Sequence, residues 1–269
     1  MTCVCILGAG HVGTALAKNL TSVGYTVFIA NSRGPSTLRE VAAGTGANAV
    51  AVADMPTDLD ILIVAVPMGR INDLPKSWIA SLSERTVFVD AGNYYPARDG
   101  AIAAIDKGLP ETRWVAEQLQ VPFIKAFNNI IAARLASCGK PKGSNNRIAL
   151  PVAGDDDVSR QQVMKIVDEI GFDPFDAGLL SESWRQQPGQ PAYCTDPNAN
   201  ELPRLLSRAD SSKGAKNRNR ASSLLARLPE GYPAAELVRV SRLFVGLDLL
   251  NIRNWISALK LVISLKKGK

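Results

Sequence analysis

The chain of 269 residues has 31 Lys and Arg against 25 Asp and Glu, and 46% of its residues are hydrophobic. This composition is that of a globular protein with one large or two modest domains, and it excludes a disordered chain. No segment reaches the roughly 20 uninterrupted apolar residues of a membrane-spanning helix. The apolar N-terminus lacks the basic region of a signal peptide, so we expect a cytoplasmic protein without a transmembrane segment.

The net charge of +6 is unevenly distributed along the chain. Residues 1–180 carry a net charge of −2 and residues 181–269 a net charge of +8. A basic C-terminal third beside a nearly neutral remainder argues against a nucleic-acid-binding core. Four Cys without a CxxC pair and a single His predict no metal site. The acidic run at 155–157 precedes a predicted helix and is interpreted as a helix cap.

The first 178 residues alternate between strand-like and helix-like runs. In chain order, the pattern predicts strand 2–7, helix 11–23, strand 25–30, helix 36–43, strands 48–52, 61–66 and 86–90, helix 111–119, extended segment 122–127, strand 147–153, helix 158–170 and strand 172–176. This alternation is typical of an α/β fold with a doubly wound parallel sheet. Pro151 indicates an edge or an end position for the strand at 147–153. We predict a Rossmann domain over residues 1–178, with its sheet extended by the late strands.

Residues 179–269 differ in character and form a second predicted region. Residues 184–191 are rich in Gln, Pro and Gly and predict a loop, and residues 211–220 predict an exposed linker. Residues 234–265 predict helices that are apolar on most faces, which favours a helical arm that forms a homo-oligomer. A helix on a membrane surface is the alternative, because Trp255 and the basic residues Lys266, Lys267 and Lys269 suit one.

The hexapeptide Gly8-Ala9-Gly10-His11-Val12-Gly13 is a GxGxxG motif. It directly follows the first predicted strand and opens a helix, the context of a dinucleotide-binding fingerprint. Gly8 permits a tight turn, Gly10 lets the backbone approach a pyrophosphate, and Gly13 lets the helix pack on the strand. We interpret His11 as a loop residue beside the phosphates instead of a catalytic base.

The end of the second strand indicates which dinucleotide binds. NAD usually needs a carboxylate there, but the strand is followed by Asn31-Ser32-Arg33 and the next carboxylate is Glu40. Amide and hydroxyl groups can bond a phosphate and Arg can clamp it, which predicts a 2′-phosphate pocket for NADP(H). The alternative is that Arg33 is a solvated loop charge.

Three further strand ends are candidate ligand sites, because ligands of such sheets bind at the carboxyl ends of strands. Small residues at Ala65-Val66-Pro67 and at Gly92-Asn93 leave room for the nicotinamide ribose, or are ordinary residues of strand-to-loop turns. Asn128 and Asn129, which follow an apolar run, can hold a carboxamide or a flat heterocycle, or can simply form a loop. The sequence has no Tyr-xxx-Lys pair, so we assign no catalytic residue. The absence of a proton donor favours hydride transfer to a flavin-like carrier or to an easily reduced acceptor.

Several of these motifs together resemble the NADP-dependent coenzyme F420 reductase family. The segments that carry the resemblance are Gly8–Gly13, Asn31–Arg33, Val64–Pro67, Val89–Asn93 and Lys125–Ile130, within about residues 2–178. The oxidoreductase domains of the STEAP metalloreductases look similar. The resemblance implies an NADP-binding Rossmann domain with two late strands, and hydride exchange between NADPH and a deazaflavin or flavin.

The resemblance also implies roles for individual residues. Residues 8–12 would lie along the pyrophosphate, residues 31–33 would hold the 2′-phosphate, and residues 65–67 would border the ribose and nicotinamide. Ala126, Phe127 and Asn128 would line the place where the acceptor ring stacks. Trp184, in a C-terminal third that does not match a compact reductase of this family, could cover the acceptor as a lid or belong to a packed loop.

The expected function is hydride transfer between NADP(H) and a deazaflavin, flavin-like or other small-molecule acceptor. The enzymatic alternative is a ketone or imine reductase of the 6-phosphogluconate or pyrroline-carboxylate type, which would need a proton donor. The third hypothesis is an NADPH-binding sensor without catalysis, which the basic tail and the scarcity of catalytic side chains favour.

Overall fold

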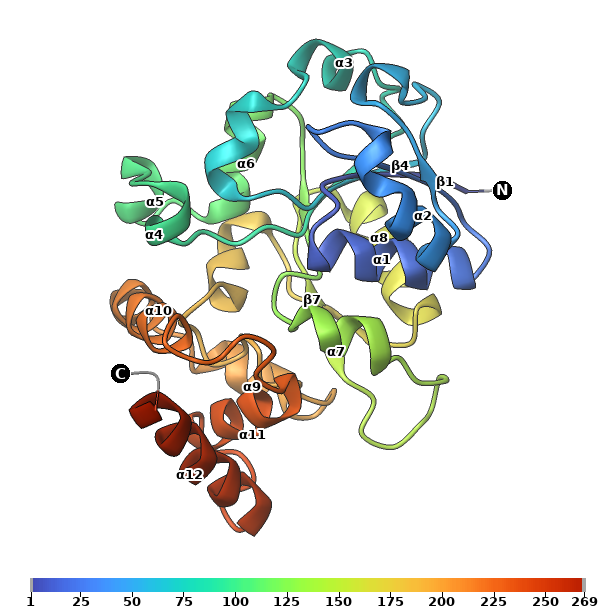
Figure 1. The fold of residues 1–269 in the computed structure, drawn as a ribbon. Helices are drawn as coiled ribbons and strands as arrows, with labels where there is room; N and C mark the ends of the chain where they lie inside the picture. Colours follow the sequence, from blue (N-terminus) through green and yellow to red (C-terminus); the bar gives the residue numbers. More distant parts are fainter. Residues whose placement is uncertain (1, 268–269) are drawn as a thin grey trace.

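Six parallel strands form the central sheet of the computed structural model, which describes residues 2–267 (Figure 1). Their bounds are β1 (Cys3–Leu7), β2 (Thr26–Ala30), β3 (Asn48–Ala49), β4 (Ile61–Val64), β5 (Val87–Asp90) and β6 (Ile124–Lys125). The strand order is β3-β2-β1-β4-β5-β6, and all neighbours pair in parallel. The order reverses between β1 and β4, so the ligand crevice of this Rossmann fold is expected there.

Two late strands extend this architecture as a separate sheet. Strands β7 (Ala149–Val152) and β8 (Asp173–Asp176) pair in parallel with each other. An isolated antiparallel bridge between Lys125 and Ala153 joins β7 to the edge of β6. The prediction of additional strands is therefore confirmed, with the difference that they attach through one bridge and do not continue the main ladder.

Helices cover both faces of the main sheet. Their bounds are α1 (His11–Ser22), α2 (Arg39–Thr45), α3 (Lys76–Ala80), α4 (Pro96–Asp99), α5 (Ala103–Asp106), α6 (Glu111–Leu119), α7 (Ala132–Ser137) and α8 (Asp157–Glu169), with 3₁₀ segments η1 (Pro35–Leu38), η2 (Val52–Asp54) and η3 (Met68–Asp73). Alternate residues of β1 enter different cores: Val4 and Ile6 join one cluster, and Cys5 and Leu7 join the other. A strand covered on both faces explains its continuous apolar sequence.

The C-terminal region is more ordered than the sequence indicates. It contains η4 (Leu180–Gln186), α9 (Leu202–Ser207), α10 (Ser211–Leu225), α11 (Ala234–Phe244) and α12 (Ile252–Lys267). The predicted linker at 211–220 is wrong because it lies inside α10, which Asp210 caps by accepting a hydrogen bond from the Ser212 N–H. The predicted loop at 184–191 is partly wrong because η4 extends to Gln186. The predicted helices in 234–265 are confirmed, interrupted by the turn after α11.

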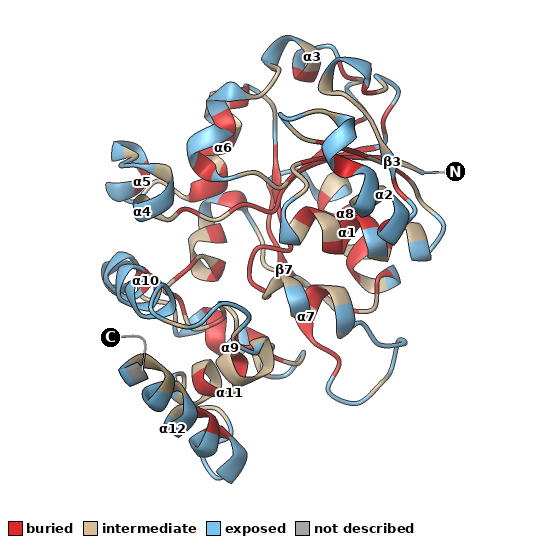
Figure 2. Ribbon diagram, viewed as in Figure 1, coloured by how far each residue is buried: buried red, intermediate tan, exposed pale blue. Residues whose placement is uncertain are grey.

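The domain boundary at residue 178 stays a prediction. Helix α9, which follows this boundary, packs on β7, which precedes it, through a small apolar cluster that includes Ala149 and Leu205. Helices α11 and α12 lie side by side at one end of the molecule, and the buried residues concentrate around the sheets (Figure 2).

The acidic cap is confirmed, since Asp156 accepts a hydrogen bond from the Ser159 N–H at the start of α8. Within residues 2–267, no helix has the length and apolar character to cross a bilayer. Lys269 lies outside these residues.

Candidate functional site

The turn between β1 and α1 depends on glycine for two different reasons. Gly8 has a φ of +112°, and a Cβ added there would lie 2.4 Å from the Ala65 carbonyl oxygen. A Cβ on Gly13 would lie 1.9 Å from the Gly8 carbonyl oxygen. Gly10 is different, because its Cβ would meet nothing within 4 Å. Packing therefore requires glycine at positions 8 and 13, whereas Gly10 leaves open space through which a ligand can approach the backbone.

The N-terminus of α1 is free of side chains that would compete with an anion. Gly10 is the N-cap and supplies no side-chain hydrogen bond, and the first turn of α1 has no acidic residue. The first backbone N–H groups of a helix have no partner inside the helix, and they carry its positive dipole end. His11 is exposed on this turn, and Ala9 and Val12 are partly buried. This arrangement fits a pyrophosphate.

The loop after β2 lies beside this turn, since the Gly8 N–H donates to the Ala30 carbonyl at 2.9 Å. Asn31 shapes the loop: its Oδ1 accepts from the Arg33 N–H and its Nδ2 donates to Thr37 Oγ1, both at 3.0 Å. Ser32 and Arg33 are left exposed. The three predicted phosphate-binding residues therefore lie in one loop, where Asn31 acts as a scaffold and the other two face solvent.

The ends of β4 and β5 complete the crevice. The Ala65 N–H donates to the Leu7 carbonyl at 2.8 Å, which holds the start of the β4 loop against the end of β1. Val66 is half-buried and Pro67 is exposed. Gly92 is buried, and its N–H donates to Asp90 Oδ1 at 2.8 Å. The structure thus brings the predicted ribose-side residues together at the carboxyl edge of the sheet.

Three amide side chains link the end of β6 to the C-terminal region. Asn128 Nδ2 donates to Asn93 Oδ1 at 3.1 Å and to the Gln186 carbonyl at 2.9 Å, and Asn128 Oδ1 accepts from Gln186 Nε2 at 3.0 Å. Both N–H groups of the Asn128 carboxamide are therefore engaged within the protein. In this arrangement Asn128 positions Asn93 and η4, so its predicted contact with a ligand would need these bonds to open.

The predicted acceptor-side residues separate into a buried and an accessible group. The Phe127 ring is 0% exposed and packs in the core, so it presents no face for stacking in this structure. Ala126 and Asn129 are also buried, and the Asn129 carboxamide finds no hydrogen-bond partner among residues 2–267. Trp184 is partly exposed and stacks with the Arg185 guanidinium at 5.0 Å. Only Trp184 among these residues offers accessible ring surface.

A buried charged cluster behind the crevice was not predicted. Lys125 Nζ lies 3.2 Å from Asp90 Oδ2 and 3.5 Å from Glu111 Oε2, and it donates to the Gly92 carbonyl at 2.6 Å. Thr112 Oγ1 donates to Asp90 Oδ2, the same oxygen that Lys125 contacts. All of these side chains are buried. One signal was available in the sequence, because Lys125 interrupts an apolar run and Asp90 ends another.

Glu111 is the member of this cluster with a strongly shifted pKa. Burial raises its pKa from 4.5 to about 7, while the ammonium of Lys125 opposes the rise. With Glu111 protonated, the cluster reduces to one compensated pair between Lys125 and Asp90. This pair fixes the Gly92 backbone at the end of β5, and so it positions the wall of the crevice without facing it.

The raised pKa predicts a pH dependence of stability. Between pH 4.5 and about 7 folded Glu111 keeps a proton that the unfolded chain has released. Stability from this group is therefore full below that window and falls as pH rises through it, with a slope of up to about 1.4 kcal/mol per pH unit. The free energy of unfolding of Glu111→Gln, measured by denaturation between pH 4.5 and pH 7, should lack this slope. Glu117→Gln, on the exposed side of α6, should retain it, and equal slopes in all three proteins would contradict the assignment.

Two tyrosine hydroxyls meet near the crevice. Tyr95 Oη and Tyr193 Oη are 2.7 Å apart, and this contact joins the loop after β5 to the C-terminal region. The Arg98 guanidinium donates to the Asn93 carbonyl at 2.6 Å in the same loop. Burial raises the pKa of both phenols. The sequence could not reveal this pair, because its members are 98 residues apart.

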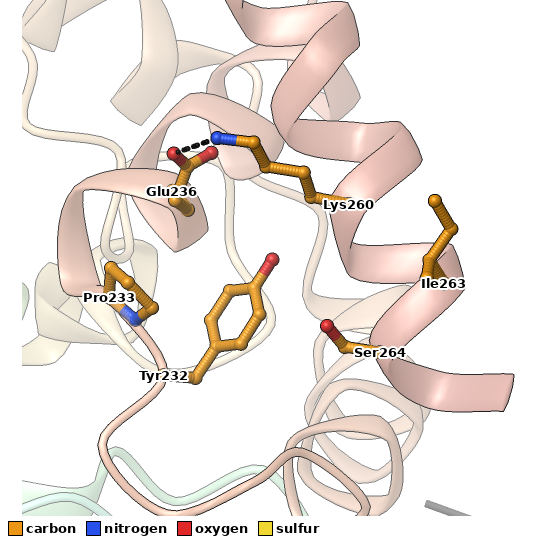
Figure 3. A pocket seen from close by; sticks show the side chains of 6 residues that line it. All are labelled: Tyr232, Pro233, Glu236, Lys260, Ile263 and Ser264. Carbon is orange, nitrogen blue, oxygen red and sulfur yellow. Dashed lines mark hydrogen bonds and ion pairs between the residues drawn. The ribbon is translucent and has the colours of Figure 1, made fainter. Parts of the chain in front are cut away.

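Two cavities in the structure lie away from the glycine turn. One cavity of about 260 Å³ lies between the start of α11 and α12, and its lining includes Tyr232, Glu236 and Lys260 (Figure 3). Lys260 Nζ donates to Glu236 Oε1 at 3.1 Å across it. A second cavity of about 180 Å³ lies between β8, η4 and α9. Neither of these two cavities includes the glycine turn, so we assign the candidate crevice from the backbone geometry at the strand ends.

Comparisons with known proteins agree on the N-terminal part. Residues 3–94 match the model of the family described as "NADP oxidoreductase coenzyme F420-dependent". The Escherichia coli (strain K12) protein YjhV is 43% identical over 92 residues, which cover 34% of this chain and 60% of that protein. This chain thus spans about 60% of the length of that curated relative.

Solved structures extend the likeness over more of the chain. Protein SMa0349 from Sinorhizobium meliloti is 33% identical with a TM-score of 0.61, over 72% of this chain and 93% of that chain. A protein of Arthrobacter sp. FB24, named for a proposed F420-dependent NADP-reductase activity, has a TM-score of 0.56 at 18% identity, over 67% of this chain and 86% of that chain. The second likeness shows the fold alone.

Proposed function

Because this chain belongs to the coenzyme F420-dependent NADP oxidoreductase family, we propose that it transfers a hydride between NADP(H) and a deazaflavin or flavin-like acceptor. The observation that carries the proposal is the open space at Gly10, next to an exposed loop with Ser32 and Arg33 and no carboxylate. The first feature suits a pyrophosphate and the second suits a 2′-phosphate.

The residues of this chain would position the reactants. Backbone N–H groups of residues 10–12 would bond the pyrophosphate, and Ser32 and Arg33 would bond the 2′-phosphate. Val66 and Pro67 on one side and the Gly92–Asn93 backbone on the other would border the nicotinamide. NADPH, when bound, supplies the hydride. Trp184 would cover the acceptor and exclude water, while orientation instead of proton transfer would provide most of the rate acceleration.

Arg33→Ala is expected to weaken NADPH binding by about 10- to 100-fold, because a hydrogen bond to a charged group contributes about 1.5–3 kcal/mol. NADH lacks the 2′-phosphate, so its affinity should change by less than about twofold. Titration of both nucleotides by calorimetry measures the difference. Arg85→Ala removes an exposed charge before β5, away from the carboxyl edge, and serves as the matched control. Equal weakening of NADPH and NADH by Arg33→Ala would contradict the assignment.

The acceptor is tested by following NADPH absorbance with a panel of compounds. The panel contains the deazaflavin coenzyme, FMN, FAD, riboflavin, ferric chelates and quinones, and NADH serves as the control donor. Oxidation of NADPH by one class identifies the acceptor. Absence of NADPH oxidation across the panel, from protein that binds NADPH, would reject the deazaflavin or flavin-like acceptor and would favour a small carbonyl or imine substrate or an NADPH-binding sensor.

A ketone or imine reductase is the second candidate function, and one observation favours it. The Tyr95–Tyr193 hydroxyl pair is a proton donor of the kind that reduction of a carbonyl or imine needs. A Tyr193→Phe variant separates the two functions. Loss of turnover with small ketones or imines would support this candidate, whereas an unchanged rate with a deazaflavin or flavin would support hydride transfer to a carrier.

A further inference from the structure

Helix α12 packs against the protein through polar residues and exposes most of its large apolar residues. Its fully buried residues are Asn254 and Ser257, whose side chains are polar. Its exposed residues are mostly large and apolar, for example Trp255 at 56% and Leu259 at 61% exposure. A helix of a soluble domain normally buries its apolar stripe and exposes its polar side. The exposed stripe of α12 therefore needs a cover that residues 2–267 do not provide.

The stripe continues into the turn that precedes the helix. We define the apolar C-terminal patch as Leu249, Leu250, Ile252, Trp255, Ile256, Leu259, Val262 and Ile263. Leu250 is 100% exposed, and the Trp255 indole N–H donates to the Leu249 carbonyl at 2.8 Å, which connects the turn to the helix. Eight such side chains expose on the order of 1,000 Å², well above the few hundred Å² of ordinary surface patches.

The charges around the patch are almost all positive. Helices α11 and α12 and the turn between them, residues 234–267, contain six Lys and Arg but only two Asp and Glu. Both acids are already paired: Glu236 with Lys260 and Arg239, and Asp248 with Arg242. Helix α12 itself has no acidic residue, while Arg253, Lys260 and Lys266 on it are exposed.

This charge pattern discriminates between the two possible covers. A second copy packed through α12 would place cations opposite cations in either helix direction, because paired helices use acidic and basic residues at their margins to match. An anionic bilayer surface instead offers phosphates to the cations and an acyl boundary to the apolar side chains. Indole rings such as that of Trp255 favour the same interface.

We propose that the apolar C-terminal patch docks this protein on the surface of an anionic phospholipid bilayer, with α12 parallel to the membrane plane. The turn at Leu249 and Leu250 and the exposed stripe of α12 would enter the headgroup region, and the basic residues of α12 would contact phosphates. This inference is independent of the proposed function, since it involves no residue of the dinucleotide crevice.

The test is co-sedimentation of the full chain with vesicles of phosphatidylcholine, with and without phosphatidylglycerol. We expect binding that requires phosphatidylglycerol, weakens as salt is raised and is not displaced by inorganic phosphate. Binding should also shift Trp fluorescence to shorter wavelength, and Trp255→Phe should abolish this shift. The fluorescence signal in the unaltered patch keeps the proposal testable even where a patch variant folds poorly.

The double variant Leu250→Glu and Leu259→Glu should bind vesicles at least about tenfold more weakly. A control with Val23→Glu and Val158→Glu adds the same two charges at exposed apolar positions outside the C-terminal region and should reduce binding much less. Absence of vesicle binding, or equal binding of both variants, would overturn the proposal. A concentration-dependent dimer that buries Trp255 and is lost in the patch variant would assign the patch to a second copy.

Discussion

Replacing Lys125 with Met is expected to lower the free energy of unfolding by about 3–5 kcal/mol, because removal of one partner leaves a buried charge without compensation. The Asp90 carboxylate would lose the cation at 3.2 Å, and the Gly92 carbonyl would lose its donor at 2.6 Å. Met preserves most of the side-chain volume, so the loss reports charge and hydrogen bonding instead of a cavity. Urea denaturation at neutral pH measures the change.

Two comparisons make this result specific. Lys165→Met removes an exposed lysine that is paired with Glu169 on α8, and it should change stability by less than about 1 kcal/mol. The double variant Asp90→Asn and Lys125→Met should be more stable than Lys125→Met alone, since it removes the uncompensated anion together with the cation. A loss below about 1 kcal/mol for Lys125→Met would show that the cluster is not a stabilising network.

The sequence predicts the sheet well because its strands are buried on both faces. Residues Ile61–Val64 and Val87–Asp90 are buried throughout, which produces the continuous apolar runs on which the prediction rests. The glycines at positions 8 and 13 are equally readable, because a Cβ at Gly8 would lie 2.4 Å from the Ala65 carbonyl oxygen and a Cβ at Gly13 would lie 1.9 Å from the Gly8 carbonyl oxygen. Strand ends and the glycine turn therefore follow from local sequence.

Helix α10 shows where local sequence fails. Its two buried residues are Gly214 and Arg218, neither of which signals a packed helix face. Close backbone contact involves glycine on both sides: a Cβ on Gly189 would lie 2.2 Å from the Gly214 carbonyl oxygen, and a Cβ on Gly214 would lie 2.6 Å from Gln190 Nε2. The Arg218 guanidinium stacks on the Tyr94 ring at 4.7 Å. A polar helix that docks through backbone contact and a cation–π interaction has no apolar periodicity, so its sequence resembles a linker.

The candidate site shows a second limit. The resemblance predicts that Phe127 contacts the acceptor, but its ring is buried in the structure. Asn128 forms its hydrogen bonds with Asn93 and Gln186. Pairs such as Tyr95 with Tyr193 and Lys125 with Glu111 depend on which segments, distant in the sequence, meet in the folded chain. Sequence pattern identifies the strand ends that carry a site, whereas side-chain direction at those ends depends on tertiary contacts.

Gly10→Ala is expected to leave the fold intact and to weaken NADPH binding by about 10- to 100-fold, since the new methyl would displace the pyrophosphate from the backbone N–H groups, and a hydrogen bond to a charged group contributes about 1.5–3 kcal/mol. The Cβ would enter open space, so the protein itself tolerates it. The backbone of Gly10, at φ −78° and ψ −173°, also suits an L-residue. Apart from its chain neighbours, no atom of residues 2–267 lies within 4 Å of this Cβ, so a loss of affinity would report a ligand at the N-terminus of α1. Calorimetric titration with NADPH measures the loss, and thermal unfolding checks the fold.

Two further glycine-to-alanine changes calibrate this result on the same scale. Gly13→Ala should lower stability by about 1–3 kcal/mol, because its Cβ would lie 1.9 Å from the Gly8 carbonyl oxygen. Gly44→Ala, in α2 with open space around it, should raise stability by about 0.5–1 kcal/mol through helix propensity. Opposite signs at Gly13 and Gly44 separate packing from propensity. A Gly10→Ala protein that is stable and still binds NADPH normally would contradict a pyrophosphate site at this turn, because then neither packing nor ligand would explain the glycine.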